Sequence, residues 1–189
     1  MQISAGVKLP CSETSTCRPD LQSVMSDPLA TYLHDHLAGS HFAIKLLETV
    51  REQYSKESLA GFAEALITDV KDDQETLQGI IERVGKAHLD WTETAGWFAE
   101  KASQLKLQRD DTEAGIGTFE ALETLAVGIR GKLALWQVLP IIRKVDPRIP
   151  DIDYGKLAER AEEQFARVEK RRLESALITF RPDQKKSGG

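Results

Sequence analysis

Residues 27–53 read DPLATYLHDHLAGSHFAIKLLETVREQ, and they carry both the start signal and the period of a long helix. Asp27 is a favourable N-cap residue, and Pro28 then falls at the first helical position, where its missing N–H costs nothing. Apolar residues recur every three or four positions from Leu29 to Tyr54, which is the spacing of one helix face. The segment is therefore predicted to be an amphipathic helix.

Three more long segments have the same period and are bounded by capping or turn residues. Gly85 suits the position just after a helix, and Pro140 is expected to kink or end a helix. A shorter segment, 90–107, opens with a capping-box pattern. The three long segments span residues 58–84 (or 55–84), 118–139 and 153–180.

Long helices joined as hairpin, crossover and hairpin predict an all-α fold. We expect an up-and-down four-helix bundle with an additional short connecting helix, over residues 26–181. Residues 1–25 are rich in Ser, Thr, Pro and Gly without a period, and 182–189 are polar. Both ends are predicted to be disordered tails.

Composition narrows the class of protein. The chain has 189 residues and a net charge of −5, which disfavours a nucleic-acid binder. It has no run of 18 apolar residues, so neither a membrane span nor a membrane partner is expected. Cys11 and Cys17 are the two cysteines and both fall in the first tail, so they form no disulfide framework. The expected location is the cytoplasm.

Several polar residues fall on the inward stripes of these helices. If the chain reverses direction near residue 56 and again near residue 148, each pair of helices forms a hairpin. These polar residues then lie at similar heights along the axis of the bundle. A polar layer in the middle of the bundle is therefore predicted. Its members are His36, Asp73, Glu120, Glu123, Glu169 and Arg172.

Two interpretations of this layer stay open. In the first, the layer holds no metal: His36 bonds to Asp73, and Arg172 pairs with Glu123 or Glu169. In the second, a divalent metal such as iron binds there. Its ligands would be His36, Asp73, Glu120 and Glu123.

The layout resembles the ferritin-like superfamily of helical bundles. Four segments also resemble a group of bacterial proteins that share this predicted fold and have no assigned activity. They are DPLATYLHDHLAGS, AGWFAEKASQLKL, GIRGKLALW and EEQFARVEKRRLESAL. Ferritins and their diiron relatives imply iron and oxygen chemistry. The Glu-x-x-His pairs that hold iron in such bundles do not occur in this chain.

The expected function is a non-catalytic, interaction or stress-associated bundle with a metal-free, paired polar core. A protein partner or a homodimer is expected, and no cofactor. The alternative is an atypical dimetal oxidase or iron-handling protein.

Gly128 and Gly131 are predicted to allow close helix packing. Trp91, Trp97 and Phe98 are expected to form a lid over one end of the bundle, with a ligand pocket or partner surface as alternatives.

Overall fold

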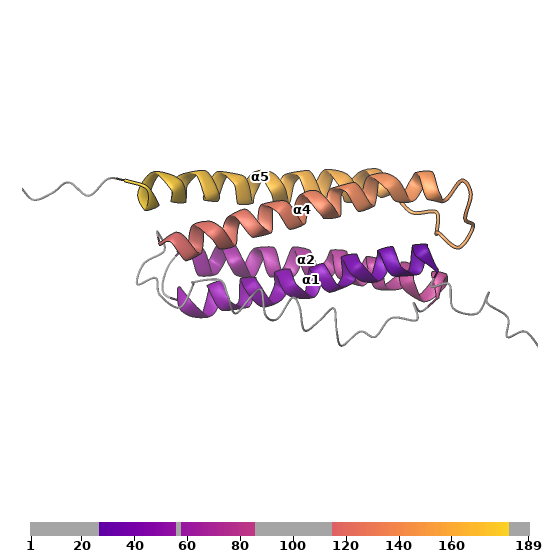
Figure 1. Cartoon of the computed structure of the whole chain (residues 1–189), viewed down its shortest axis with the longest axis horizontal. Helices are drawn as coiled ribbons and strands as arrows, with labels where there is room; N and C mark the ends of the chain where they lie inside the picture. The colour runs from indigo at the N-terminus through magenta and orange to yellow at the C-terminus, as the bar shows by residue number, and fades with distance from the viewer. Residues whose placement is uncertain (1–26, 56–57, 86–114, 182–189) are drawn as a thin grey trace, which may run out of the picture.

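The computed structural model describes residues 27–55, 58–85 and 115–181 (Figure 1). Within these ranges the protein is all-α, with four long helices and no strand. They are α1 (Pro28–Gln53), α2 (Ser58–Val84), α4 (Ile116–Ile142) and α5 (Tyr154–Thr179). The all-α bundle of four long helices is therefore confirmed. The predicted short helix at 90–107, its aromatic residues and both tails lie outside the described residues.

Local capping chemistry sets the helix ends close to where the sequence predicts them. Asp27 Oδ1 accepts a hydrogen bond from Leu29 N at 3.0 Å at the start of α1, as an N-cap residue does. Gly85 follows α2 with φ of +107°, a conformation that favours glycine. The helix α4 continues two residues past Pro140 before it ends, because a proline removes a bond only to the preceding turn.

The helices form two antiparallel hairpins that lie against each other as two layers (Figure 1). One layer contains α1 and α2, and the other contains α4 and α5. Leu33 and Leu47 of α1, Leu66 of α2 and Leu139 of α4 are among the core side chains that are almost fully buried. Burial of these apolar surfaces is the main force that holds the two layers together.

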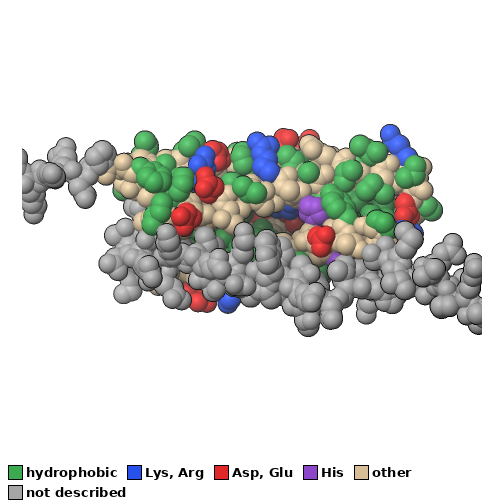
Figure 2. Space-filling view, viewed as in Figure 1, with side chains coloured by type: hydrophobic (Ala, Val, Ile, Leu, Met, Phe, Trp, Pro, Cys, Tyr) green, Lys and Arg blue, Asp and Glu red, His purple; other side chains and the backbone are tan. Residues whose placement is uncertain are grey.

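The helix α4 is the most apolar of the four. Among the described residues, it alone is long and apolar enough to cross a membrane, a test that core helices of soluble proteins also pass. Eleven of its residues are buried, and they include Trp136 with 1% of its surface exposed. Hydrophobic side chains also show at the surface over α4 and α5, where Val127 and Leu177 are 70% and 75% exposed (Figure 2).

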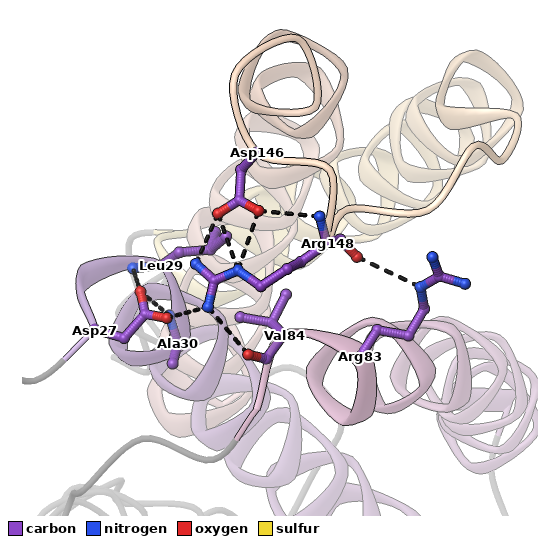
Figure 3. Close-up of polar contacts among 7 residues, drawn as sticks. All are labelled: Asp27, Leu29, Ala30, Arg83, Val84, Asp146 and Arg148. Atoms are coloured by element: carbon purple, nitrogen blue, oxygen red, sulfur yellow. Dashed lines mark hydrogen bonds and ion pairs between the residues drawn. The ribbon is translucent and has the colours of Figure 1, made fainter.

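Arg148, in the connection between α4 and α5, ties together three segments at one end of the bundle (Figure 3). Its guanidinium pairs with Asp27 at the start of α1 and with Asp146 at 2.7 Å. It also donates to the carbonyl oxygen of Val84 at 3.1 Å, at the end of α2. These contacts, which we call the Arg148 clip, hold the pKa values of Asp27 and Asp146 below their usual range.

The lowered pKa values predict how the Arg148 clip responds to acid. A carboxylate with a depressed pKa in the folded state contributes stability above its unfolded value, here 3.8, and loses it as the pH falls through the folded pKa. Arg148→Met is therefore expected to be less stable than the wild type at neutral pH. The two unfolding free energies should converge between about pH 5 and about pH 2.

Urea unfolding across this pH range measures the effect. Arg143→Met is the control, because Arg143 lies in the same connection and, within the part of the chain that the structure describes, its ion-pair partner is the exposed Asp151, at 2.7 Å. A constant gap between wild type and Arg148→Met at all pH values would show that the Arg148 clip stabilises the fold without its charges.

Candidate functional site

A buried carboxylate, that of Asp73 on α2, is bonded to side chains of two other helices. Asp73 is 3% exposed, and its Oδ2 accepts from Lys132 Nζ of α4 at 2.5 Å. The same oxygen accepts from Gln164 Nε2 of α5 at 3.1 Å, while Oδ1 pairs with Arg160 of α5. Lys132 also donates to Gln164 Oε1. We call these four residues the Asp73 cluster.

The Asp73 cluster carries one carboxylate and two cations, which leaves a net charge of +1. Burial lowers the pKa of Lys132, and the nearby Arg160 lowers it further, while Asp73 acts in the opposite direction. Both oxygens of Asp73 are engaged by donors. An ammonium has three donors, and the contacts to Asp73 and Gln164 use two of those on Lys132.

The Asp73 cluster reaches the wall of a cavity of about 780 Å³ between α1, α2 and α4. Asp73 and Lys132 both line it, and most of the other lining side chains are apolar. The molecule is visibly hollowed near the middle of the face shown in Figure 2. The apolar lining includes Phe42 and Ala43 of α1, Leu66, Val70 and Leu77 of α2, and Leu125, Ile129, Leu135 and Trp136 of α4.

Three helical glycines line the cavity: Gly39 of α1 and Gly128 and Gly131 of α4. Among the described residues, a Cβ atom built at any of the three meets nothing within 4 Å. For the four described helices, the prediction that Gly128 and Gly131 permit close helix packing is therefore wrong. The reason is that none of these helices approaches them, so their missing side chains leave space that adjoins the cavity.

Three polar aromatic residues also line the cavity: Tyr32, His36 and Trp136. The His36 ring packs edge-on against Tyr32, with centroids 4.7 Å apart. Burial lowers the pKa of His36 despite the opposing charge of Asp35, which favours a neutral ring at pH 7. Trp136 is 1% exposed, and its indole Nε1 has no hydrogen-bond partner among the described residues.

The structure divides the six residues of the predicted polar layer. His36 and Asp73 line the same cavity, but among the described residues Asp73 bonds to α4 and α5 and not to His36. Arg172 contacts Glu169 at 2.7 Å and Glu123 at 3.6 Å, the pairing considered for the metal-free interpretation.

The group around Arg172 lies apart from the Asp73 cluster. Glu123 and Lys132 are nine positions apart on α4, or about 13 Å along the helix axis. The Arg172 guanidinium lowers the pKa of Glu169 through a hydrogen bond. Glu120 is half-buried one turn away, and its carbonyl oxygen accepts from the Thr124 hydroxyl at 2.8 Å.

Metal-ligating residues are not gathered in the part of the chain that the structure describes. There, no group of three or more His, Cys, Asp or Glu side chains is close enough to hold a metal ion. Among the four candidate ligands, Glu123 is exposed and paired with Arg172.

Sequence reasoning missed Lys132, Arg160 and Gln164 as members of a site. One signal was present for Gln164, which falls between Ala161 and Val168 on the buried stripe of α5. Arg160 is four residues before Gln164, so the two share a helix face. Lys132 could have been suspected as a charged residue within the most apolar helix.

Removal of the buried carboxylate should be costly, because it leaves two cations without their counter-charge. Asp73→Leu is expected to destabilise the fold by about 3 kcal/mol. The double variant Asp73→Leu/Lys132→Met should be more stable than this single variant, because it also removes the stranded, buried ammonium.

Asp69→Leu is the matched control for denaturant unfolding. Asp69 is on the same helix and also pairs with an arginine of α5, but its side chain is 30% exposed. It should cost about 1 kcal/mol or less. Equal losses in Asp69→Leu and Asp73→Leu would contradict a special role for the buried carboxylate.

Comparisons with known proteins add no assignment to this geometry. Neither the protein-family models, nor the curated proteins, nor the solved structures gave a match to the chain. The Asp73 cluster and the adjoining cavity are therefore the basis on which a function is proposed.

Proposed function

We propose that the protein is a non-catalytic helical bundle of ferritin-like type that binds a small, largely apolar molecule in the cavity between α1, α2 and α4. The observation that carries this proposal is the cavity itself, about 780 Å³ with a fixed polar group at its wall. Ligand sites in proteins have volumes of roughly 300–1,000 Å³ and combine an apolar lining with a few placed polar groups.

The cost of the cavity supports a binding role. A glycine inside a helix costs about 1 kcal/mol relative to alanine. Gly39, Gly128 and Gly131 lower the stability of their helices in this way, and they lie beside a space that larger side chains could fill. A bound ligand would offset this loss of stability, because a molecule that binds only the folded state stabilises that state.

The metal-free interpretation of the core is supported by the charges around Asp73. Lys132 and Arg160 supply the positive charge that a metal ion would otherwise supply. Their hydrogen bonds, with that of Gln164, engage both carboxylate oxygens. A cation would have to displace these donors before it could bind.

Filling the cavity from within tests the binding proposal. The neutral fluorescent probe N-phenyl-1-naphthylamine is expected to bind saturably to the wild type. Gly131→Leu, which adds a side chain at the cavity, should weaken this binding at least about tenfold, since the side chain and the probe compete for one space.

Gly79→Leu is the matched control. Gly79 is also inside a helix, and none of the described residues comes within 4 Å of an added Cβ, but it does not line the cavity. It should bind the probe like the wild type. If the wild type does not bind the probe, or if folded Gly131→Leu binds it equally well, the binding proposal is wrong.

Elemental analysis separates this proposal from the iron alternative. Protein purified without chelator, and again after addition of ferrous iron, should contain far less than one equivalent of metal, because Lys132 and Arg160 already neutralise Asp73. Retention of about two equivalents of iron, lost in His36→Ala, would favour the alternative, in which a dimetal site supports oxidase or iron-handling chemistry.

A further inference from the structure

Resting on the proposed function, we infer that the ligand is an amphipathic carboxylate, with its anionic group at Lys132 and its hydrocarbon part in the apolar section of the cavity. The inference follows from the hydrogen-bonding groups at the cavity that can still bond to a ligand, and from the charge of those groups.

At the buried end of the cavity, Lys132 and Trp136 each offer a hydrogen-bond donor that is still unused. Two donors of Lys132 are engaged by Asp73 and Gln164, and the third N–H has no acceptor among the described residues, so it can serve a ligand. The indole N–H of Trp136 is buried without an acceptor among the described residues, and Trp136 also lines the cavity. An unpaired buried donor costs free energy, so a ligand that brings an acceptor recovers it.

The acceptors of the Asp73 cluster are already engaged. Asp73 receives bonds from Lys132, Arg160 and Gln164, and the side-chain oxygen of Gln164 accepts from Lys132. A cationic head group would have to compete with Lys132, Arg160 and Gln164 for these oxygens, and it would meet two cations. The cluster therefore discriminates against amines.

Charge balance points to an anion. The Asp73 cluster has a net charge of +1, and one carboxylate would neutralise it. The other charged residue that lines the cavity is Asp35, which is exposed, so solvent screens its charge. A charge-assisted bond from an ammonium to a carboxylate is about twice as strong as a neutral one.

The rest of the cavity fits a hydrocarbon. Leucine, isoleucine and valine side chains of α2 and α4 line it, with Phe42 and Ala43 on α1. Transfer of each methylene from water to such surroundings contributes about 0.8 kcal/mol. The apolar lining therefore provides most of the binding affinity, and Lys132 provides the selectivity for an anionic head group.

A head-group series tests the inference. Decanoate, 1-decanol and decylamine share one hydrocarbon chain and can each compete with N-phenyl-1-naphthylamine, below their aggregation concentrations, at pH 7. Decanoate should displace the probe at a concentration about tenfold lower than decanol, and decylamine should be the weakest. Lys132→Met should remove the advantage of decanoate and leave the affinity for decanol unchanged.

A second variant covers the case in which Lys132→Met does not fold. Trp136→Phe keeps an apolar ring and removes the N–H, so it should weaken decanoate more than decanol. Equal displacement by all three compounds, or a preference for decylamine, would overturn the carboxylate inference while probe binding upheld the proposed function. Probe binding that no compound in the series displaces would count against the inference too. Absence of probe binding would instead defeat the proposed function.

Discussion

The buried carboxylate of Asp73 is the constraint around which the middle of this bundle is built. A charge at 3% exposure must be neutralised by partners, and here the partners come from α4 and α5. Because Lys132 and Arg160 approach from different helices, the pairing fixes how both helices of the second hairpin face α2. Apolar packing alone allows more slippage, since it has little directionality.

The same constraint explains why the cavity lies beside the cluster. Lys132 extends from α4 toward α2, and Gly128 and Gly131 precede it on α4. A helix with small residues next to a long, anchored side chain leaves space along one face. The polar anchor thus secures the layers where apolar side chains do not fill the volume between them.

The helix boundaries could be predicted because their causes are local. Asp27 caps α1 and Gly85 follows α2 with the expected conformation, and both roles depend on neighbours within a few residues. The partners of Asp73 could not be predicted in the same way, because they depend on how each helix is rotated about its axis. Folding the first two helices about residue 56 placed His36 near Asp73, and both residues line the cavity, but it could not show that Lys132 crosses to Asp73. The role of the glycines could not be predicted either. A glycine in a helix is compatible both with close contact to a neighbouring helix and with an open cavity.

The Arg148 clip has a consequence for the order of folding. Arg148 and Asp27 are 121 positions apart in the chain, and Arg148 and Val84 are 64 apart. Contacts of such sequence separation carry a large loop-closure entropy, so we expect them to form after each hairpin has assembled. Interactions that are absent from the transition state slow unfolding more than they speed folding. The Arg148 clip would then lower the unfolding rate and so lengthen the lifetime of the folded bundle.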